Sequence, residues 1–219
     1  MGLLDSFRNA LQKPALPAGD PLQLAARRAA AYRKLFVGEP IRVLPHDQFQ
    51  KPAFGGRLDV HLYEMAYERE TGQVQVAVTS GMSDYLMLDN STADGPPRRR
   101  ELIQYFRDCK MLDLVRLHDM AWVPLAQGFA LDFFHTVGSY PSFNSAWPNA
   151  LFLPSLVKPH AEFELDLGEG EPMQLLWHVP LSEAELNYKA ANGVNALLQR
   201  MGEVKLPWIF DENNRPALV

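Results

Sequence analysis

The stretch VAVTSGMSDYLMLDN, residues 76–90, combines the clearest strand pattern of the sequence with a polar turn directly after it. Val74, Val76 and Val78 alternate with glutamine, alanine and threonine, which is the period of a half-buried strand with one apolar face. Thr79 falls on the other side of that strand, so we expect its side chain to face outward. Residues 80–84, Ser-Gly-Met-Ser-Asp, are typical of a turn. The stretch therefore predicts a strand that ends in a polar corner.

The turn resembles half of a nucleophile elbow, because Gly81 lies two residues before Ser83. The elbow needs small residues on both sides of the serine, and Tyr85 stands where the second one should be. A hydrolase that uses Ser83 with a histidine base is therefore an alternative hypothesis. The simpler interpretation is a structural corner in which Asp84 accepts hydrogen bonds from the backbone of its own turn.

Outward from this corner, helices and strands are grouped along the chain rather than strictly alternating. Apolar periodicity predicts helices over residues 21–36, around 101–106, over 111–135 with a bend at Pro124, and over 182–202. It predicts strands over residues 41–44, 57–67, 72–80, 151–156, 161–167, 173–179 and 207–211. This order predicts an α+β fold, a single-domain α/β sandwich whose mixed, mainly antiparallel sheet is packed by helices.

Capping residues set two of the helix boundaries. Asp20 before Pro21 is a helix start, and Ser182 with Glu185 forms a capping box. We expect the second of these helices to run without a break to Gly202. Residues 1–19 read as a short amphipathic helix followed by a proline-rich linker, and residues 20–219 as the domain itself.

Composition excludes several functional classes. The chain of 219 residues has a formal net charge of -5, so no general field attracts nucleic acid, and we interpret the basic run 98–100 as the solvated face of a helix. Cys109 is the single cysteine, and none of the six histidines is spaced as in helix-borne zinc sites. We expect no metal and no cofactor. No apolar run approaches the roughly 20 residues of a membrane helix, so we expect a soluble cytoplasmic protein.

The order of features resembles the suppressor of fused family. The resemblance rests on VTSGMSD (residues 78–84), ELIQYF (101–106), HTVG (135–138) and the run LWHVPLSEAELNYKAANGVNALLQRM (176–201). It covers roughly residues 22–210. No single motif is specific enough to establish the resemblance, which depends on all four segments occurring in this order.

This resemblance implies an α/β sandwich domain without a known catalytic site that acts by binding another protein. Larger animal relatives restrain Gli-type transcription factors by holding an extended peptide between two domains, and this chain lacks the length of the second half. Some bacterial single-domain relatives are proposed immunity proteins of polymorphic toxin systems. A third hypothesis is a structural subunit that assembles through the N-terminal helix.

Two sets of residues are candidates for binding a partner protein or extended peptide. A polar turn beside an edge strand can accept a peptide by strand addition, and aromatic side chains are enriched at binding hot spots. The candidates are Ser80, Gly81, Ser83, Asp84 and Tyr85 of the turn, and Tyr140, Phe143 and Trp147 of the aromatic segment GSYPSFNSAW.

Overall fold

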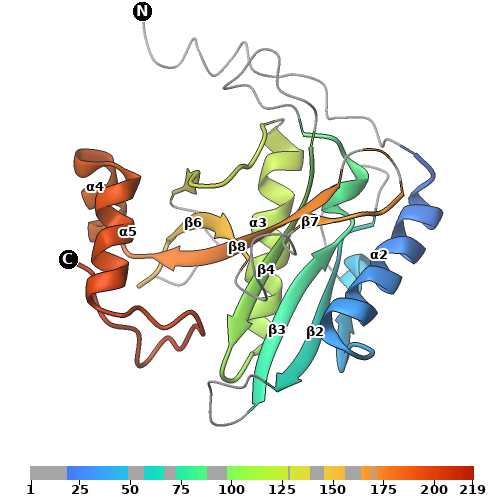
Figure 1. Cartoon of the computed structure of the whole chain (residues 1–219), viewed down its shortest axis with the longest axis horizontal. Helices are drawn as coiled ribbons and strands as arrows, with labels where there is room; N and C mark the ends of the chain where they lie inside the picture. The colour runs from blue at the N-terminus through green and yellow to red at the C-terminus, as the bar shows by residue number, and fades with distance from the viewer. Residues whose placement is uncertain are drawn as a thin grey trace, which may run out of the picture.

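The computed structural model describes residues 19–48, 57–66, 73–87, 98–127, 129–138, 146–155, 164–168, 170 and 172–219. The predicted N-terminal helix and linker lie outside these residues, apart from Gly19. Within them, eight strands form one mixed sheet in the order β1-β2-β3-β4-β8-β6-β5, with β7 also paired to β8 (Figure 1). The strands are β1 (Arg42–Leu44), β2 (Asp59–Ala66), β3 (Gln73–Ser80), β4 (Arg99–Phe106), β5 (Thr136–Val137), β6 (Asn149–Pro154), β7 (Glu164–Leu165) and β8 (Met173–Leu181).

Helices cover both faces of this sheet. Buried residues of α2 (Pro21–Phe36) and α5 (Val194–Glu203) pack on one face, against side chains that include Val76 and Tyr105. Buried residues of α3 (Met111–Gln127) pack on the other face, which includes Ala77 and Leu102. Neighbouring residues of one strand belong to different clusters because their side chains point to opposite faces. The predicted α+β sandwich is therefore confirmed.

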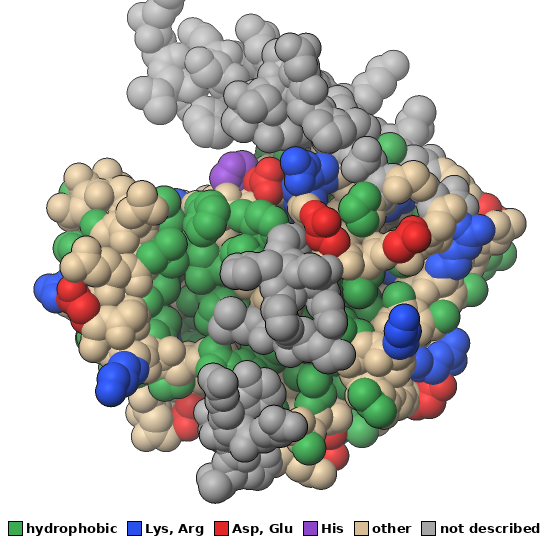
Figure 2. All heavy atoms as spheres, in the orientation of Figure 1, with side chains coloured by type: hydrophobic (Ala, Val, Ile, Leu, Met, Phe, Trp, Pro, Cys, Tyr) green, Lys and Arg blue, Asp and Glu red, His purple; other side chains and the backbone are tan. Residues whose placement is uncertain are grey.

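The sheet is antiparallel except where β4 and β8 run parallel, with Ile103 opposite Trp177. Figure 1 shows α3 behind the sheet, α2 in front on the right, and α4 (Glu183–Asn192) with α5 at the left. On the face drawn in Figure 2, hydrophobic side chains gather beside α4 and α5, whereas charged side chains are scattered over other parts of that face. None of the described helices is long and apolar enough to cross a membrane.

The helix predicted around residues 101–106 is wrong, because these residues form β4. All eight residues of β4 are buried, including Arg99, Arg100 and Glu101, so the interpretation of the basic run as a solvated helix face is also wrong. The prediction failed because β4 is covered on both faces. A strand covered in this way has no alternation of apolar and polar residues.

Thr79 does not face outward as predicted. It is fully buried, because the supposedly polar side of β3 is the second packed face of the sheet, the one that α3 covers. The long C-terminal helix is two helices, separated at Gly193, whose φ of 85° is outside the range that side-chain-bearing residues favour.

Several predicted boundaries also shift. The helix predicted to reach residue 135 ends at Gln127, three residues beyond Pro124. The predicted strand 207–211 contributes only a bridge between Phe106 and Phe210. The helix start at Asp20 and the capping box of Ser182 and Glu185 are confirmed.

A polar pair lies inside the sheet between β4 and β8. His178 Nδ1 is 2.8 Å from Gln104 Oε1, and only 6% of the His178 residue is exposed. Burial lowers the pKa of His178 from 6.5 to about 3. The folded chain therefore keeps this imidazole neutral at pH values where the unfolded chain binds a proton.

This pKa shift predicts acid sensitivity. Below pH 6.5 the unfolded chain binds one more proton than the folded chain at His178, so His178 should cost about 2 kcal/mol of unfolding free energy between pH 7.5 and 5. His178→Asn retains a donor near Gln104 and should remove that part of the pH dependence. Urea denaturation of both proteins at the two pH values measures it, and equal losses in both would contradict the assignment to His178.

Candidate functional site

The corner after β3 is built on one glycine. Gly81 has a φ of 131° and starts the short 3-10 turn Met82–Asp84. A methyl group at Gly81 would lie 1.7 Å from the carbonyl oxygen of Arg57, so only glycine fits. This close approach locks the corner against the segment that leads into β2.

Glu101 of β4 accepts the hydrogen bonds that the corner donates. Its carboxylate accepts hydrogen bonds from the backbone N–H groups of Gly81 (2.8 Å) and Ser83 (2.9 Å). It also accepts from the hydroxyls of Thr79 (2.6 Å) and Ser83 (2.7 Å). Glu101 is fully buried, and four donors of the corner satisfy its oxygens.

Arg28 of α2 contacts the same corner. Its guanidinium donates to the hydroxyls of Ser80 (3.2 Å) and Ser83 (3.1 Å) and to the carboxylate of Asp84. Its Nε lies 3.6 Å from a Glu101 oxygen. We name Arg28, Ser80, Ser83, Asp84 and Glu101 the corner cluster; it joins α2, β3, β4 and the turn.

The buried charges of the corner cluster compensate one another, because Arg28 lies beside the carboxylates of Asp84 and Glu101. Burial lowers the pKa of Arg28, but the negative charges of Glu101 and Asp84 more than compensate and raise it. Burial raises the pKa of Asp84, which Arg28 opposes. Arg99 donates to the carbonyl oxygen of Ser83 at 2.7 Å and adds a second positive charge nearby. The expected backbone partner of Asp84 is thus replaced by an arginine from a distant helix.

This geometry does not suit catalysis by Ser83. Its hydroxyl is fully buried and hydrogen-bonded to Glu101 and Arg28, so within the described part of the chain the nucleophile would have neither a histidine base bonded to it nor access to a substrate. Among the described residues, no group of three or more His, Cys, Asp or Glu side chains could hold a metal ion.

The candidate binding residues fall in different places. Those of the turn are all buried: Ser80, Gly81, Ser83, Asp84 and Tyr85. Tyr140 and Phe143 lie outside the described residues. Trp147 is partly exposed, and its ring lies against the guanidinium of Arg215 at 4.2 Å. The structure therefore separates Trp147 from the turn by location: Trp147 lies at the surface, and the turn lies inside the core.

Arg215 links Trp147 to a second buried ion pair. It makes two hydrogen bonds to Glu185, of 2.8 and 3.0 Å, and the two side chains are only 4% and 1% exposed. The same Glu185 side chain accepts from the backbone of Ser182 in the capping box. The C-terminal segment is thus held against the start of α4.

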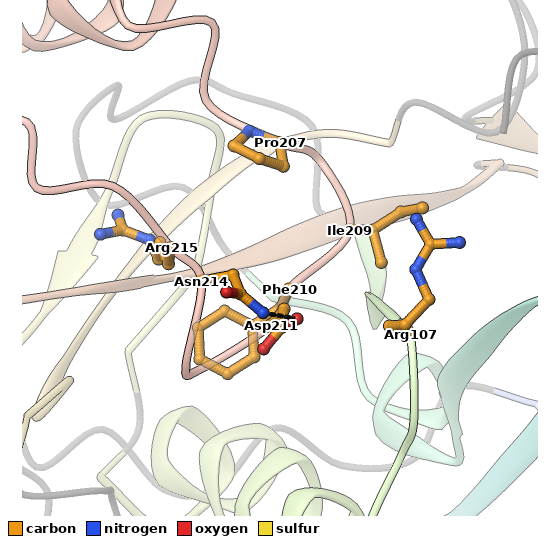
Figure 3. A pocket seen from close by; sticks show the side chains of 7 residues that line it. All are labelled: Arg107, Pro207, Ile209, Phe210, Asp211, Asn214 and Arg215. Atoms are coloured by element: carbon orange, nitrogen blue, oxygen red, sulfur yellow. Dashed lines mark hydrogen bonds between the residues drawn. The ribbon is translucent and has the colours of Figure 1, made fainter. Parts of the chain in front are cut away.

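Beside this pair the segment 207–215 borders two hollows that the sequence did not indicate. The first has a volume of about 280 Å³ and is shown in Figure 3, with Arg107 and Arg215 on opposite sides and Phe210 between them. Its lining residues are Arg107, Pro207, Ile209, Phe210, Asp211, Asn214 and Arg215. The second, of about 260 Å³, lies on the α3 side and is lined by Phe106, Arg107, Asp108, Lys110, Asp113 and residues 210–214. The run of proline, aromatic and polar residues in PWIFDENNRP, residues 207–216, was the available sequence signal, but its pattern predicts a strand over residues 207–211.

Comparison with known proteins identifies related folds. The family model described as suppressor of fused protein (SUFU) matches residues 56–215. A SUFU homolog from Neisseria gonorrhoeae FA 1090 is similar with a TM-score of 0.64 and 15% identity, over 90% of this chain and 98% of that one. A chain of the Sufu–Fu complex gives a TM-score of 0.56 and 13% identity, over 85% of each chain. Drosophila Suppressor of Fused gives 0.50 and 13%, over 65% of this chain and 38% of that one. No curated protein sequence matches significantly.

Gly81→Ala should destabilise the fold by about 3 kcal/mol or more, because the added methyl group overlaps the Arg57 carbonyl and the backbone conformation disfavours alanine. Gly202→Ala is the matched control: it lies in α5 with open space around it and should be neutral or stabilising by up to about 1 kcal/mol. Thermal and urea denaturation measure both. Similar stabilities of the two variants would show that the corner tolerates a side chain.

Arg28→Met should cost about 3–5 kcal/mol at pH 7, because two buried carboxylates lose their guanidinium. Burial raises the pKa of Asp84, so the folded variant takes up a proton more readily than the unfolded chain, and its deficit should shrink as the pH falls from 7 to 5.

Arg33→Met is the control in the same helix. Arg33 pairs with Glu39 at the surface, where such a pair contributes about 1 kcal/mol at most. Urea denaturation at several pH values compares the three proteins. A deficit of Arg28→Met that stays constant or grows on acidification would contradict the ionic role of the cluster.

Proposed function

Because the chain belongs to the suppressor of fused family, we propose that it acts by binding another protein or an extended peptide rather than by catalysis. The family match over residues 56–215 confirms the resemblance inferred from the sequence. Similarity to a chain of the Sufu–Fu complex supports a protein as the partner.

The burial of the corner cluster is the observation that carries this proposal. Ser83, Asp84 and Glu101 have the side chains of this region that are best suited to catalysis. Inside the core their hydrogen bonds go to other members of the corner cluster. Charged groups so arranged stabilise a scaffold and are unavailable to a substrate. The corner therefore serves binding indirectly, by fixing the relative positions of α2, β3 and β4.

More specifically, we propose that the chain is an immunity protein, which binds a toxin and neutralises it. The chain covers 98% of a bacterial SUFU homolog, so its length suits a single-domain protein of this kind. Its formal net charge of -5 suits a basic surface on a toxin, because complementary charges accelerate encounter and orient the two proteins. In this form the chain covers the toxin's working surface and blocks it.

The test starts from capture of the partner. The tagged full chain, passed over a lysate of its source organism, should retain a protein that then forms a stoichiometric complex with the purified chain in light scattering. Co-expression with a toxin encoded next to this chain should restore growth if the immunity form holds. Retention of no specific protein, with no complex and no rescue, would overturn protein binding.

The hydrolase alternative is tested in parallel with ester and thioester substrates. The wild-type chain should show no turnover above that of Ser83→Ala, with circular dichroism as a control for folding. Turnover that disappears in a folded Ser83→Ala variant would establish catalysis and contradict the proposal.

A further inference from the structure

We propose that the second hollow, beside Phe210 and Glu212, receives an arginine side chain of the partner protein. The inference rests on the proposed function, because it names the place and the chemistry of the contact. The hollow has a volume of about 260 Å³, which is enough to hold one long side chain.

Aromatic rings form one wall of this hollow. Phe106 at the end of β4 and Phe210 lie edge to face, with ring centroids 6.4 Å apart and an interplanar angle of 84°. Phe210 is fixed because its backbone N–H donates to the carbonyl oxygen of Tyr105 at 2.8 Å. Phe210 is partly exposed, and a planar guanidinium can stack on an aromatic ring of this kind.

The other walls are polar and carry more acidic than basic side chains. Four acidic and two basic side chains line the hollow, so its charge favours a cation. Glu212 is exposed and has no partner among the described residues, whereas Asp108 pairs with Lys110 at the surface. A surface pair of this kind exchanges partners at little cost. An incoming arginine therefore meets carboxylates that can accept its hydrogen bonds.

The chain uses the same chemistry on the other side of Phe210. There the guanidinium of Arg215 lies over the Trp147 ring at 4.2 Å and donates twice to Glu185. The Trp147 ring in turn lies edge to face with Phe210, at 6.5 Å. An arginine between Phe210 and Glu212 would repeat this combination of ring and carboxylate, with its donors supplied from outside the chain. Lysine fits less well, because an ammonium lacks the planar fork.

Titration of the nitrogen-15-labelled full chain with N-acetyl-arginine methylamide tests the site. The amide resonances of residues 106–113 and 210–214 should shift and saturate with a Kd of about 1–10 mM. The citrulline derivative, which has the same shape without the charge, and the glutamate derivative should leave them unchanged. Shifts with the glutamate derivative, equal shifts with the citrulline derivative, or none with arginine would overturn the proposal.

Glu212→Lys should weaken binding of the arginine derivative about five-fold or more. Asp47→Lys is the matched control, because Asp47 is also an exposed acid without a described partner, and it follows β1 at the other end of the strands. Its affinity should change by less than about two-fold. Equal weakening in both variants would show a general charge effect and contradict the site.

The same two variants separate this inference from the proposed function. A captured partner should bind Glu212→Lys more weakly than Asp47→Lys. A partner that binds both variants like the wild type would leave protein binding intact and overturn the arginine site. Arginine binding at the hollow without any protein partner would support the site and contradict the proposed function.

Discussion

The buried carboxylate of Glu101 is the constraint on which the rest of the fold depends. A charge in a core is tolerated only if its hydrogen bonds and its countercharge are supplied nearby. Here β3 and the turn supply four donors, and α2 supplies the guanidinium of Arg28. The strand order, the glycine at position 81 and the placement of α2 must all be correct at once. The corner cluster thus fixes the positions of α2, β3 and β4 relative to one another, which hydrophobic packing alone would specify less closely.

Local signals in the sequence were sufficient for much of the fold. The alternation of valines in β3 and the capping box at Ser182 each depend on residues within a few positions, and both were predicted correctly. The family assignment also followed from the sequence, because an ordered set of short motifs indicated it, and the family model matches residues 56–215. What is encoded locally could be predicted locally.

The failure at β4 has a physical cause that local patterns do not show. Arg99, Arg100 and Glu101 are charged, and a charged run usually marks a solvated surface. Here each is paired with groups far away in the sequence: Arg100, for example, binds Asp132, 32 residues later. Periodicity cannot show that such partners exist, so β4 was mistaken for a helix whose basic run faces the solvent. The hollows beside residues 207–215 were missed for the same reason, because they form only where β4, α3 and the C-terminal segment meet.

The contacts of Glu185 make the end of the described chain part of its architecture. This one carboxylate caps the start of α4, holds Arg215 and accepts a hydrogen bond from the backbone of Leu218. Residues 215–218 therefore open and close together with a helix that begins some 30 residues earlier. A protease that removed this segment would therefore leave the buried capping carboxylate of α4 without its guanidinium, and a fusion partner attached there would load the same contacts.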